Sequence, residues 1–188
     1  GYENYKYKPL LTGVGHSFIE VDHRSVGRFK LYAEEADEFL FCDNETNFAR
    51  LHQSPNLSHF TKDGINDYVV NKNKHAVNPN HIGTKAAAKY TAKIPPGGKK
   101  VFRLRLVDHT LSQPFADFDE VFALRLREAD EFYADLQEGI EDPGLQSLQR
   151  QSYAGMLWTK WAMMKPRMPL KITAVTANRH DCSTTIQN

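Results

Sequence analysis

The spacing of apolar residues changes from a period of two to a period near 3.6 at about residue 112, which limits the fold to strands followed by helices. From Thr84 to Ile94 small or apolar residues alternate with mostly lysine and threonine. Pro95–Gly98 is a turn signal, since proline presets φ and glycine accepts a positive φ, and Lys99–Val107 alternates again. The pattern predicts a β-hairpin with one apolar face. Its other face would be a solvated basic surface, with a surface for an anionic glycan or nucleic acid as the alternative, formed by Lys85, Lys89, Lys93, Arg103 and Arg105.

Three shorter runs upstream have the composition of strands. They are Ser17–Asp22, Arg28–Tyr32 and Glu38–Cys42, and polar turn sequences separate them. Tyr2–Leu11 is aromatic and basic, which is typical of an edge strand or a loose arm. This spacing favours antiparallel pairing, and a sheet with one apolar face needs a second layer. We therefore predict antiparallel, β-sandwich-like sheets.

The second half of the chain has helical periodicity. Between Phe115 and Leu136 apolar residues recur every three or four positions, which predicts a helix ending near Gly139. After a Glu-Asp-Pro-Gly break, a second pattern predicts a helix from Leu145 to about Met164. The predicted class is thus mainly β with C-terminal α-helices, an α+β fold.

These patterns predict three segments. Residues 1–112 form the β-sandwich-like domain, and residues 113–164 form a linker and helical segment. Residues 165–188 contain two prolines and have no helical period, so we expect a poorly ordered tail there.

Composition narrows the function classes. Of the 188 residues, 40% are hydrophobic and 25% are charged, which fits a soluble globular chain. No apolar run approaches the roughly 20 residues of a spanning helix, and the first residues lack a signal-peptide pattern, so we expect no membrane partner. A net charge of +1 argues against nucleic acid as the main partner. The compartment stays open, because the sequons at Asn44 and Asn56 have meaning only in the secretory pathway.

The cysteines and histidines predict neither a metal nor another cofactor. Cys42 and Cys182 have no zinc spacing, which favours one buried thiol and one tail thiol, with a disulfide as the alternative. The eight histidines form no HExxH or short HxH pattern. His75 and His81 lie in a polar region and are interpreted as surface residues.

Six blocks of the chain resemble a known family. In order, they are FLFCDNETNFARL, KDGINDYVV, AVNPNHIGTKAAAKY, PPGG, PFADFDEVFALRLREADEFYADLQ and QRQSYAGMLWTK. Together they are similar to glycoside hydrolase family 63, in particular its large microbial glucosidase-like members, over about Tyr7 to Lys160. The resemblance implies an N-terminal β-sandwich, a helical linker, and an (α/α)6 barrel that carries the two carboxylates of an inverting α-glycosidase.

On this template the chain covers the later part of the sandwich, the linker helix and the first barrel helix. The family pattern ends at Lys160, and the catalytic carboxylates of the barrel have no counterpart here. The resemblance therefore assigns no catalytic residue to this chain. It also implies that the sandwich loops help to wall the barrel's sugar pocket.

The stretch Cys42–Lys85 holds the candidate sugar-binding residues. It is rich in Asn, Asp, Gly and Pro, and its polarity predicts a long loop region outside the core. Carboxylates and amides can bind vicinal hydroxyl groups, and a tyrosine ring can cover a sugar face. The alternative is that these residues serve turns. The candidates are Asp43, Asn44, Glu45, Asn47, Lys62, Asp63, Asn66, Asp67, Tyr68, Asn78 and Lys85.

The sequence supports three hypotheses of function. The first is a non-catalytic carbohydrate-recognition or structural fragment of a family 63-like α-glucosidase, with a glucose-containing oligosaccharide as partner. The second is glycoside hydrolase activity only with a complementing catalytic barrel. The third is a protein-interaction module that forms a homo-oligomer through exposed helices.

Overall fold

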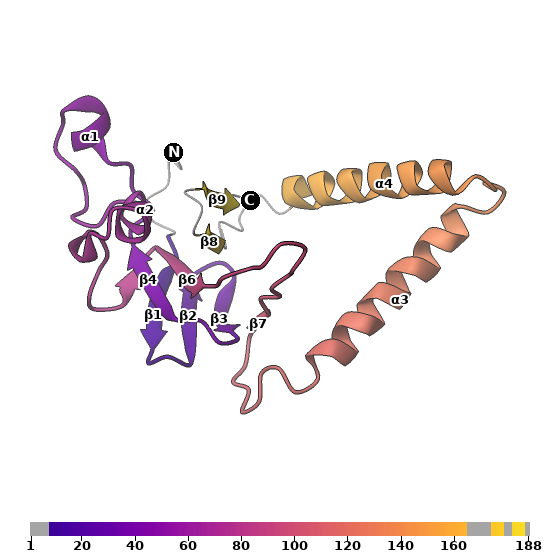
Figure 1. Ribbon diagram of the computed structural model, residues 1–188, viewed down its shortest axis with the longest axis horizontal. Helices are drawn as coiled ribbons and strands as arrows, with labels where there is room; N and C mark the ends of the chain where they lie inside the picture. Colours follow the sequence, from indigo (N-terminus) through magenta and orange to yellow (C-terminus); the bar gives the residue numbers. More distant parts are fainter. Residues whose placement is uncertain (1–7, 165–173, 179–181, 187–188) are drawn as a thin grey trace. The chain divides into compact units, whose positions relative to one another are not determined.

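The computed structural model describes residues 8–164, 174–178 and 182–186, and the side chains as far as Thr159. The described chain divides into two compact units. The first contains the residues up to Ser112 together with strands β8 (Ala174–Asn178) and β9 (Cys182–Ile186), and the second begins at Gln113 and contains two helices (Figure 1). The fold is α+β, with mainly antiparallel strands in two sheets and C-terminal helices, as predicted.

The first sheet is antiparallel throughout. In spatial order its strands are β5 (Ile82–Gly83), β1 (Leu10–Val14), β2 (Phe18–His23), β3 (Gly27–Ala33) and β7 (Leu104–Val107).

The second sheet has the order β4, β6, β8 and β9. Strand β4 (Glu38–Cys42) pairs antiparallel with β6 (Lys85–Thr91), and β6 pairs in parallel with β8. The strands predicted over 17–22, 28–32 and 38–42 are confirmed to within two residues at each end.

The predicted hairpin between residues 84 and 107 is wrong. Strand β6 pairs with β4, whereas β7 pairs with β3 in the other sheet, where Leu106 lies opposite Leu31. The alternation was interpreted correctly, because both runs turn apolar residues into the space between the sheets, and the rings of Tyr90 and Phe102 lie 4.5 Å apart. Periodicity reports which face of a strand is buried, but it does not identify the pairing partner.

The predicted basic surface disappears with the hairpin. The Lys89 ammonium lies 2.5 Å from the Glu38 carboxylate, and the Arg103 guanidinium lies 3.3 Å from that of Glu34. Lys89 thus lies in the second sheet, whereas Arg103 directly precedes β7 of the first sheet, and each is paired with an acid.

A first core cluster fills the space between the two sheets. Leu11, Ile19 and Val21 come from the first sheet, and Phe39, Phe41, Ala88 and Tyr90 come from the second. Ile19 and Phe41 are almost fully buried. This packing makes the first unit a β-sandwich.

The region between β4 and β6 is not a simple loop. It contains α1 (Phe48–His52), α2 (Gly64–Val69) and the 3-10 turn η2 (Lys74–Ala76). Ile65 and Val69 of α2 pack with Val77 against the other face of the second sheet, where they meet Leu40, Cys42 and Ala87. The prediction that this polar region lies outside the core is therefore wrong: it supplies a second core cluster.

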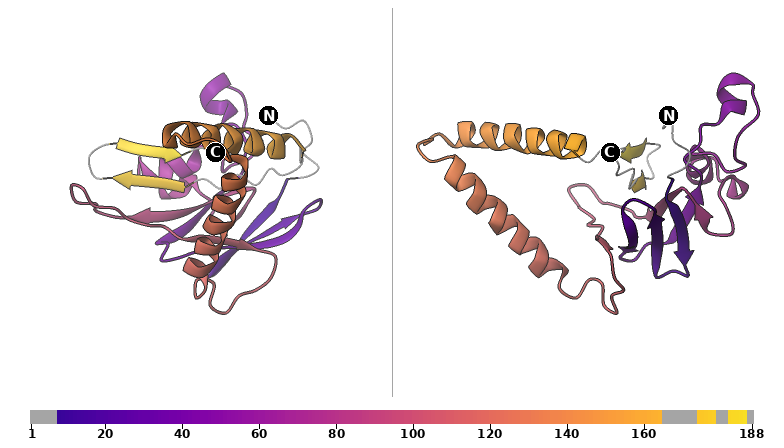
Figure 2. Two further views of the ribbon diagram at one scale, coloured as in Figure 1. Left: turned by 90° about the vertical axis from the view of Figure 1, so that its right-hand side faces the viewer. Right: turned by 180° about the vertical axis from the view of Figure 1, so that it is seen from behind.

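Gly64 permits this close packing. A Cβ atom at that position would collide with the carbonyl oxygen of Ala76, so α2 can lie against η2 only with glycine there. Figures 1 and 2 show α1 at the far end of the same region, away from the strands.

The second unit consists of α3 (Phe118–Leu136) and α4 (Pro143–Met164), close to the predicted helices. Near their turn the Arg150 guanidinium lies 2.7 Å from Asp130 and 4.8 Å from the centre of the Tyr133 ring. Figures 1 and 2 show the two helices diverging from that turn. No helix in the described part of the chain is long and apolar enough to cross a membrane.

Two predictions concern the ends of the chain. The arm or strand expected over residues 2–11 is described only from Lys8, and β1 begins at Leu10. Within the predicted tail the backbone forms β8 and β9, and residues 165–173, 179–181 and 187–188 lie outside the described residues.

Candidate functional site

The site is built on α1, which is a single short helical turn capped at both ends. The side chain of Asn47 accepts a hydrogen bond from the backbone N–H of Arg50 at 3.1 Å. Gln53 ends the helix in the left-handed region, with φ of 54°. A helix of this length has little stability of its own, so side-chain contacts must hold it in place.

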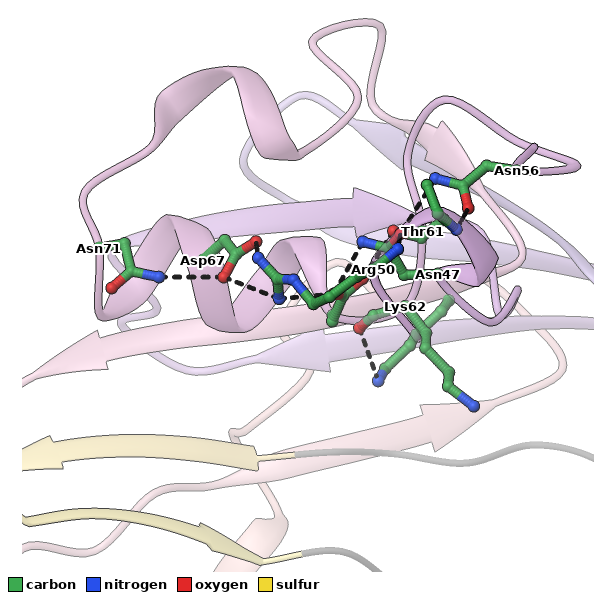
Figure 3. A network of polar contacts seen from close by, with 10 residues as sticks. Asn47, Arg50, Asn56, Thr61, Lys62, Asp67 and Asn71 are labelled. Carbon is green, nitrogen blue, oxygen red and sulfur yellow. Dashed lines mark hydrogen bonds and ion pairs between the residues drawn. The ribbon is translucent and has the colours of Figure 1, made fainter. Parts of the chain in front are cut away.

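Arg50 supplies those contacts by bridging α1 to α2. Its guanidinium lies 2.7 Å from Asp63 Oδ2 and 2.7 Å from Asp67 Oδ2. The side chain of Arg50 is 53% exposed, whereas those of Asp63 and Asp67 are 26% and 14% exposed. The two carboxylates are thus held near the surface with the arginine spread across them, as Figure 3 shows for Arg50 and Asp67.

Amide side chains complete the network on the α1 side. Asn47 donates to Asp63 Oδ2 at 3.0 Å and accepts from the amide of Asn56 at 3.1 Å. Asn56 in turn accepts from the backbone N–H of Ala49 at 2.8 Å, and the hydroxyl of Thr61 donates to Asp63 at 2.6 Å. At the other end Asn71 donates to Asp67 at 3.0 Å (Figure 3). We call these seven residues the Arg50 network: Asn47, Arg50, Asn56, Thr61, Asp63, Asp67 and Asn71.

The electrostatics keep the network ionised. Burial by itself would raise the pKa of Asp63, but hydrogen bonds from Thr61 and Asn47 and the charge of Arg50 lower it below its usual value. The pKa of Arg50 is raised, first by its hydrogen bond to Asp67 and then by the charges of Asp67 and Asp63. These shifts favour the charged forms of Asp63 and Arg50 at neutral pH.

Tyr68 lies in a separate group of polar contacts. Its hydroxyl donates to Glu38 Oε2 at 2.6 Å, and Lys89 donates to the other oxygen of Glu38 while its ammonium lies 5.5 Å from the centre of the Tyr68 ring. The ring packs against the second core cluster. The hydrogen bond to Glu38 raises the pKa of Tyr68. Burial would raise the pKa of Glu38, but hydrogen bonds from Lys89 and Tyr68 lower it.

The candidates that directly follow β4 fix the start of the region. Asp43 accepts a hydrogen bond from the hydroxyl of Ser58, and the backbone N–H of Asn44 donates to Thr84 Oγ1 at 2.8 Å. Glu45 forms an ion pair with Lys8. Together these contacts tie the chain after β4 to segments on either side of it.

The remaining candidates are scattered. Lys62 donates to Thr46 Oγ1 at 3.1 Å, and Lys85 donates to the backbone carbonyl of Lys62 at 3.4 Å. Asn78 stabilises a turn by donating to the backbone carbonyl of Ile82 at 2.7 Å. Asn66 is exposed on α2. Of the eleven predicted residues, the structure thus brings Asn47, Asp63 and Asp67 into the Arg50 network. The other eight lie outside that network.

The residue at the centre of the network was not predicted. Arg50 stands in the run FARL, which resembles an ordinary helical segment, and its acidic partners lie 13 and 17 positions further along. A local signal exists at Asn47, an N-cap residue type three positions before Arg50, and it marks the helix start but not the ion pairs.

The described part of the chain forms no metal site, and the thiol of Cys42 is unreactive. No three His, Cys, Asp or Glu side chains converge there to hold a metal ion. Cys42 is a free, fully buried thiol, and its burial raises its pKa to about 12. A thiol with such a pKa is a poor nucleophile at neutral pH.

Comparison with known proteins finds a relative in yeast. The chain is 36% identical over 155 aligned residues to "Uncharacterized protein YMR196W" of Saccharomyces cerevisiae, a match that covers 69% of this chain and 14% of the yeast protein. The chain thus spans about a seventh of the length of that relative. No protein-family model and no solved structure matches the chain.

Proposed function

We propose that this chain is a non-catalytic, carbohydrate-recognising part of a family 63-like α-glucosidase, and that the Arg50 network and its surroundings contact a glucose-containing oligosaccharide. The choice of a sugar as the ligand comes from the resemblance to glycoside hydrolase family 63 described above. The match to a much longer yeast protein is consistent with a part that works beside other domains.

One observation carries the proposal: planar polar groups are held in fixed orientations at an exposed surface. Sugar-binding sites use carboxylate, amide and guanidinium groups in this way, because a preorganised group loses little entropy when it binds a hydroxyl. Here Arg50, Asn47 and Asp63 fix one another through hydrogen bonds of 2.7 to 3.1 Å.

The network keeps groups that a sugar can reach. Arg50 is more than half exposed, and Asn56 and Asn71 are exposed at the two ends of the network. Asn66, one turn of α2 before Val70, is exposed as well. At these exposed positions vicinal hydroxyl groups can exchange water for amide and guanidinium contacts.

The test is calorimetric titration of the chain with linear oligosaccharides of α-linked glucose. We expect weak, saturable heats for the wild type. Asp67→Ala should weaken binding by about tenfold or more, because it removes the acceptor that orients both Arg50 and Asn71. Tyr68→Ala should have a smaller effect, since the ring packs against the core and its hydroxyl is bound to Glu38.

Asp22→Ala is the matched control. Asp22 also pairs with an arginine, Arg28, but on β2 and β3 of the other sheet, and the side chains are 49% and 75% exposed. Its binding heats should equal those of the wild type. Identical heats for the wild type, Asp67→Ala and Asp22→Ala would contradict the proposal.

A specific observation also favours a structural role for the same residues. Each carboxylate of the network already receives at least two hydrogen bonds from within the chain. A clamp that only fastens α1 to α2 would show no heat with any sugar, while Asp67→Ala would still lower the urea midpoint of the first unit. The two roles thus predict different results in the sugar titration and the same result in the unfolding experiment.

A further inference from the structure

We propose that Ser54 is a phosphorylation site for a proline-directed serine/threonine kinase, and that the phosphate releases α1 from α2. This modification is independent of whether a sugar binds, although it acts on the helix that carries Arg50. Three features support it: the dipeptide Ser54–Pro55, the exposure of the segment around it, and the hydrogen bonds by which Ser54 closes α1.

The dipeptide Ser54–Pro55 is a single target in this sequence. In the 188 residues no other serine or threonine is followed directly by proline. Proline has no backbone N–H, and it holds the residue before it in an extended conformation. A proline-directed kinase selects its serine by these two properties. Its action on this chain is therefore expected at one position.

The segment around Ser54 is accessible to an enzyme. Every residue from Ala49 to Leu57 is exposed, and α1 has no buried residue. Figures 1 and 2 show α1 away from the strands. A kinase binds several residues on each side of its target serine in its active-site cleft. This segment can enter such a cleft without opening either core cluster, since its local opening costs little.

Ser54 closes the C-terminal end of α1 with two hydrogen bonds. Its backbone N–H donates to the carbonyl oxygen of Phe48 at 3.3 Å. Its hydroxyl donates to the carbonyl oxygen of His52 at 3.2 Å. The hydroxyl that a kinase would modify is thus a donor to the last residue of the helix.

Phosphorylation changes the chemical character of this group. The Ser54 hydroxyl oxygen attacks the γ-phosphorus of ATP, the bond from that phosphorus to the bridging oxygen breaks, and ADP leaves. The hydroxyl proton passes to the catalytic base of the kinase. A neutral donor therefore becomes a phosphate with a charge of about −1.5 to −2 at pH 7 and acceptor oxygens only.

The phosphate weakens the attachment of α1 in two ways. It places negative oxygens beside the carbonyl oxygen of His52, at a helix C-terminus, where negative charge is unfavourable. It also competes for the guanidinium of Arg50, which is 53% exposed and precedes Ser54 by four residues. Because α1 has no buried residue, the loss of these contacts suffices to release it from α2.

The first experiment identifies the target. The full chain is incubated with ATP and a purified proline-directed kinase, and the phosphate is counted by intact mass and located by tandem mass spectrometry. We expect one phosphate on Ser54 of the wild type and none on Ser54→Ala or Pro55→Ala. Ser112→Ala is the control, at an exposed serine two residues before Pro114, and should be phosphorylated like the wild type.

The second experiment measures the effect on α1 by amide hydrogen exchange. In the phosphorylated wild type, exchange in α1 should be about threefold faster or more, with little change in β4 or α3. Ser54→Ala loses the hydroxyl hydrogen bond without gaining charge and should show a smaller increase. An equal increase in Ser54→Ala overturns the role of the charge.

The proposal is supported if phosphate transfer needs both Ser54 and Pro55 and if the phosphorylated chain shows the largest loss of protection in α1. A wild-type chain that takes no phosphate, or takes it equally well as Pro55→Ala, overturns the site. Unchanged or slower exchange in α1 after phosphorylation overturns the release, because the phosphate would then hold the helix through Arg50. Neither readout involves a sugar, so both are distinguishable from failure of the proposed carbohydrate binding.

Discussion

The region between β4 and β6 and the α3–α4 hairpin use their side chains in opposite ways. The first is polar in sequence, yet Ile65, Val69 and Val77 are buried against the second sheet. The second has the stronger apolar periodicity, yet Phe122 and Leu126 are more than half exposed. Burial is therefore set by whether another surface lies within reach, and not by how apolar a segment is.

Strand β4 explains the difference. Its last four residues are buried, which means that both of its faces are covered, one by the first sheet and one by α2. A few apolar residues in a polar segment suffice when they all meet such a strand. In the second unit, among the side chains up to Thr159, the contacts of Arg150 and Gln149 with α3 lie near the turn that joins α3 to α4.

The largest test of this comparison is the same substitution in both regions. Phe41→Ala should lower the free energy of unfolding of the first unit by about 3–5 kcal/mol, because Phe41 is 0% exposed and its removal leaves a cavity. Phe122→Ala should change the stability by less than about 0.5 kcal/mol, since Phe122 is already 67% exposed. Urea unfolding followed by circular dichroism measures both.

The result for Phe122→Ala can contradict the difference in packing between the two regions. A loss of more than about 1 kcal/mol would mean that another surface covers the ring in solution. The hairpin would then be as well packed as the sandwich.

Two adjacent valines give a smaller and more local test. Val69 is 4% exposed in the second core cluster, whereas Val70 is 49% exposed. Val69→Ala should destabilise the first unit by about 2 kcal/mol, which is the loss of two buried methyl groups with little relaxation. Val70→Ala should cost less than about 0.5 kcal/mol. Similar losses in urea unfolding would show that α2 does not pack on β4 by one face.

The same comparison shows what the sequence could predict. Alternation located β2, β3, β4 and β6, and three- to four-residue spacing located α3 and α4, because these periods follow from backbone geometry alone. The pairing of β6 and β7 was mispredicted, since the PPGG turn predicts that the chain reverses but not which strand it meets. Long-range pairing depends on the whole sandwich.

Only part of the candidate site was predicted, because its contacts also join residues that are far apart in the sequence. Asn47, Asp63 and Asp67 were identified by residue type, but their association depends on Arg50, which reaches across from α1 to α2. Ile65 and Val69 were overlooked as core residues because polar residues surround them in the sequence. A six-residue helix such as α2 is too short for its periodicity to stand out.

Acid should weaken the first unit through the carboxylates that surround α2. The pKa of Asp63 and that of Glu38 are lowered in the folded chain, mainly by hydrogen bonds that outweigh burial. A carboxyl group that is a stronger acid when folded stabilises the fold above its unfolded pKa, near 4, and this stabilisation is lost as the pH falls through the folded value. We therefore expect the urea concentration at the unfolding midpoint to decrease as the pH is lowered below about 5.

Neutral variants identify the source of that dependence. Asp63→Asn and Glu38→Gln should each be less stable than the wild type at pH 7 and should show a flatter pH profile. Asp22→Asn, at the exposed pair with Arg28, should follow the wild-type profile. A wild-type midpoint that stays constant or rises between pH 6 and about pH 3 would refute the assignment.

The smallest effect is expected where the polar region is held only at its surface. Arg50→Gln removes both ion pairs to α2 but leaves the second core cluster untouched, so the urea midpoint should fall less than for Val69→Ala. Amide hydrogen exchange should respond more clearly, with several-fold faster exchange in α1 and little change in β4, because α1 has no buried residue to hold it. Arg28→Gln is the control and should change neither region. If α1 keeps its protection in Arg50→Gln, then the hydrogen bonds of Asn47 and Asn56 hold it, and the ion pairs serve a surface role alone.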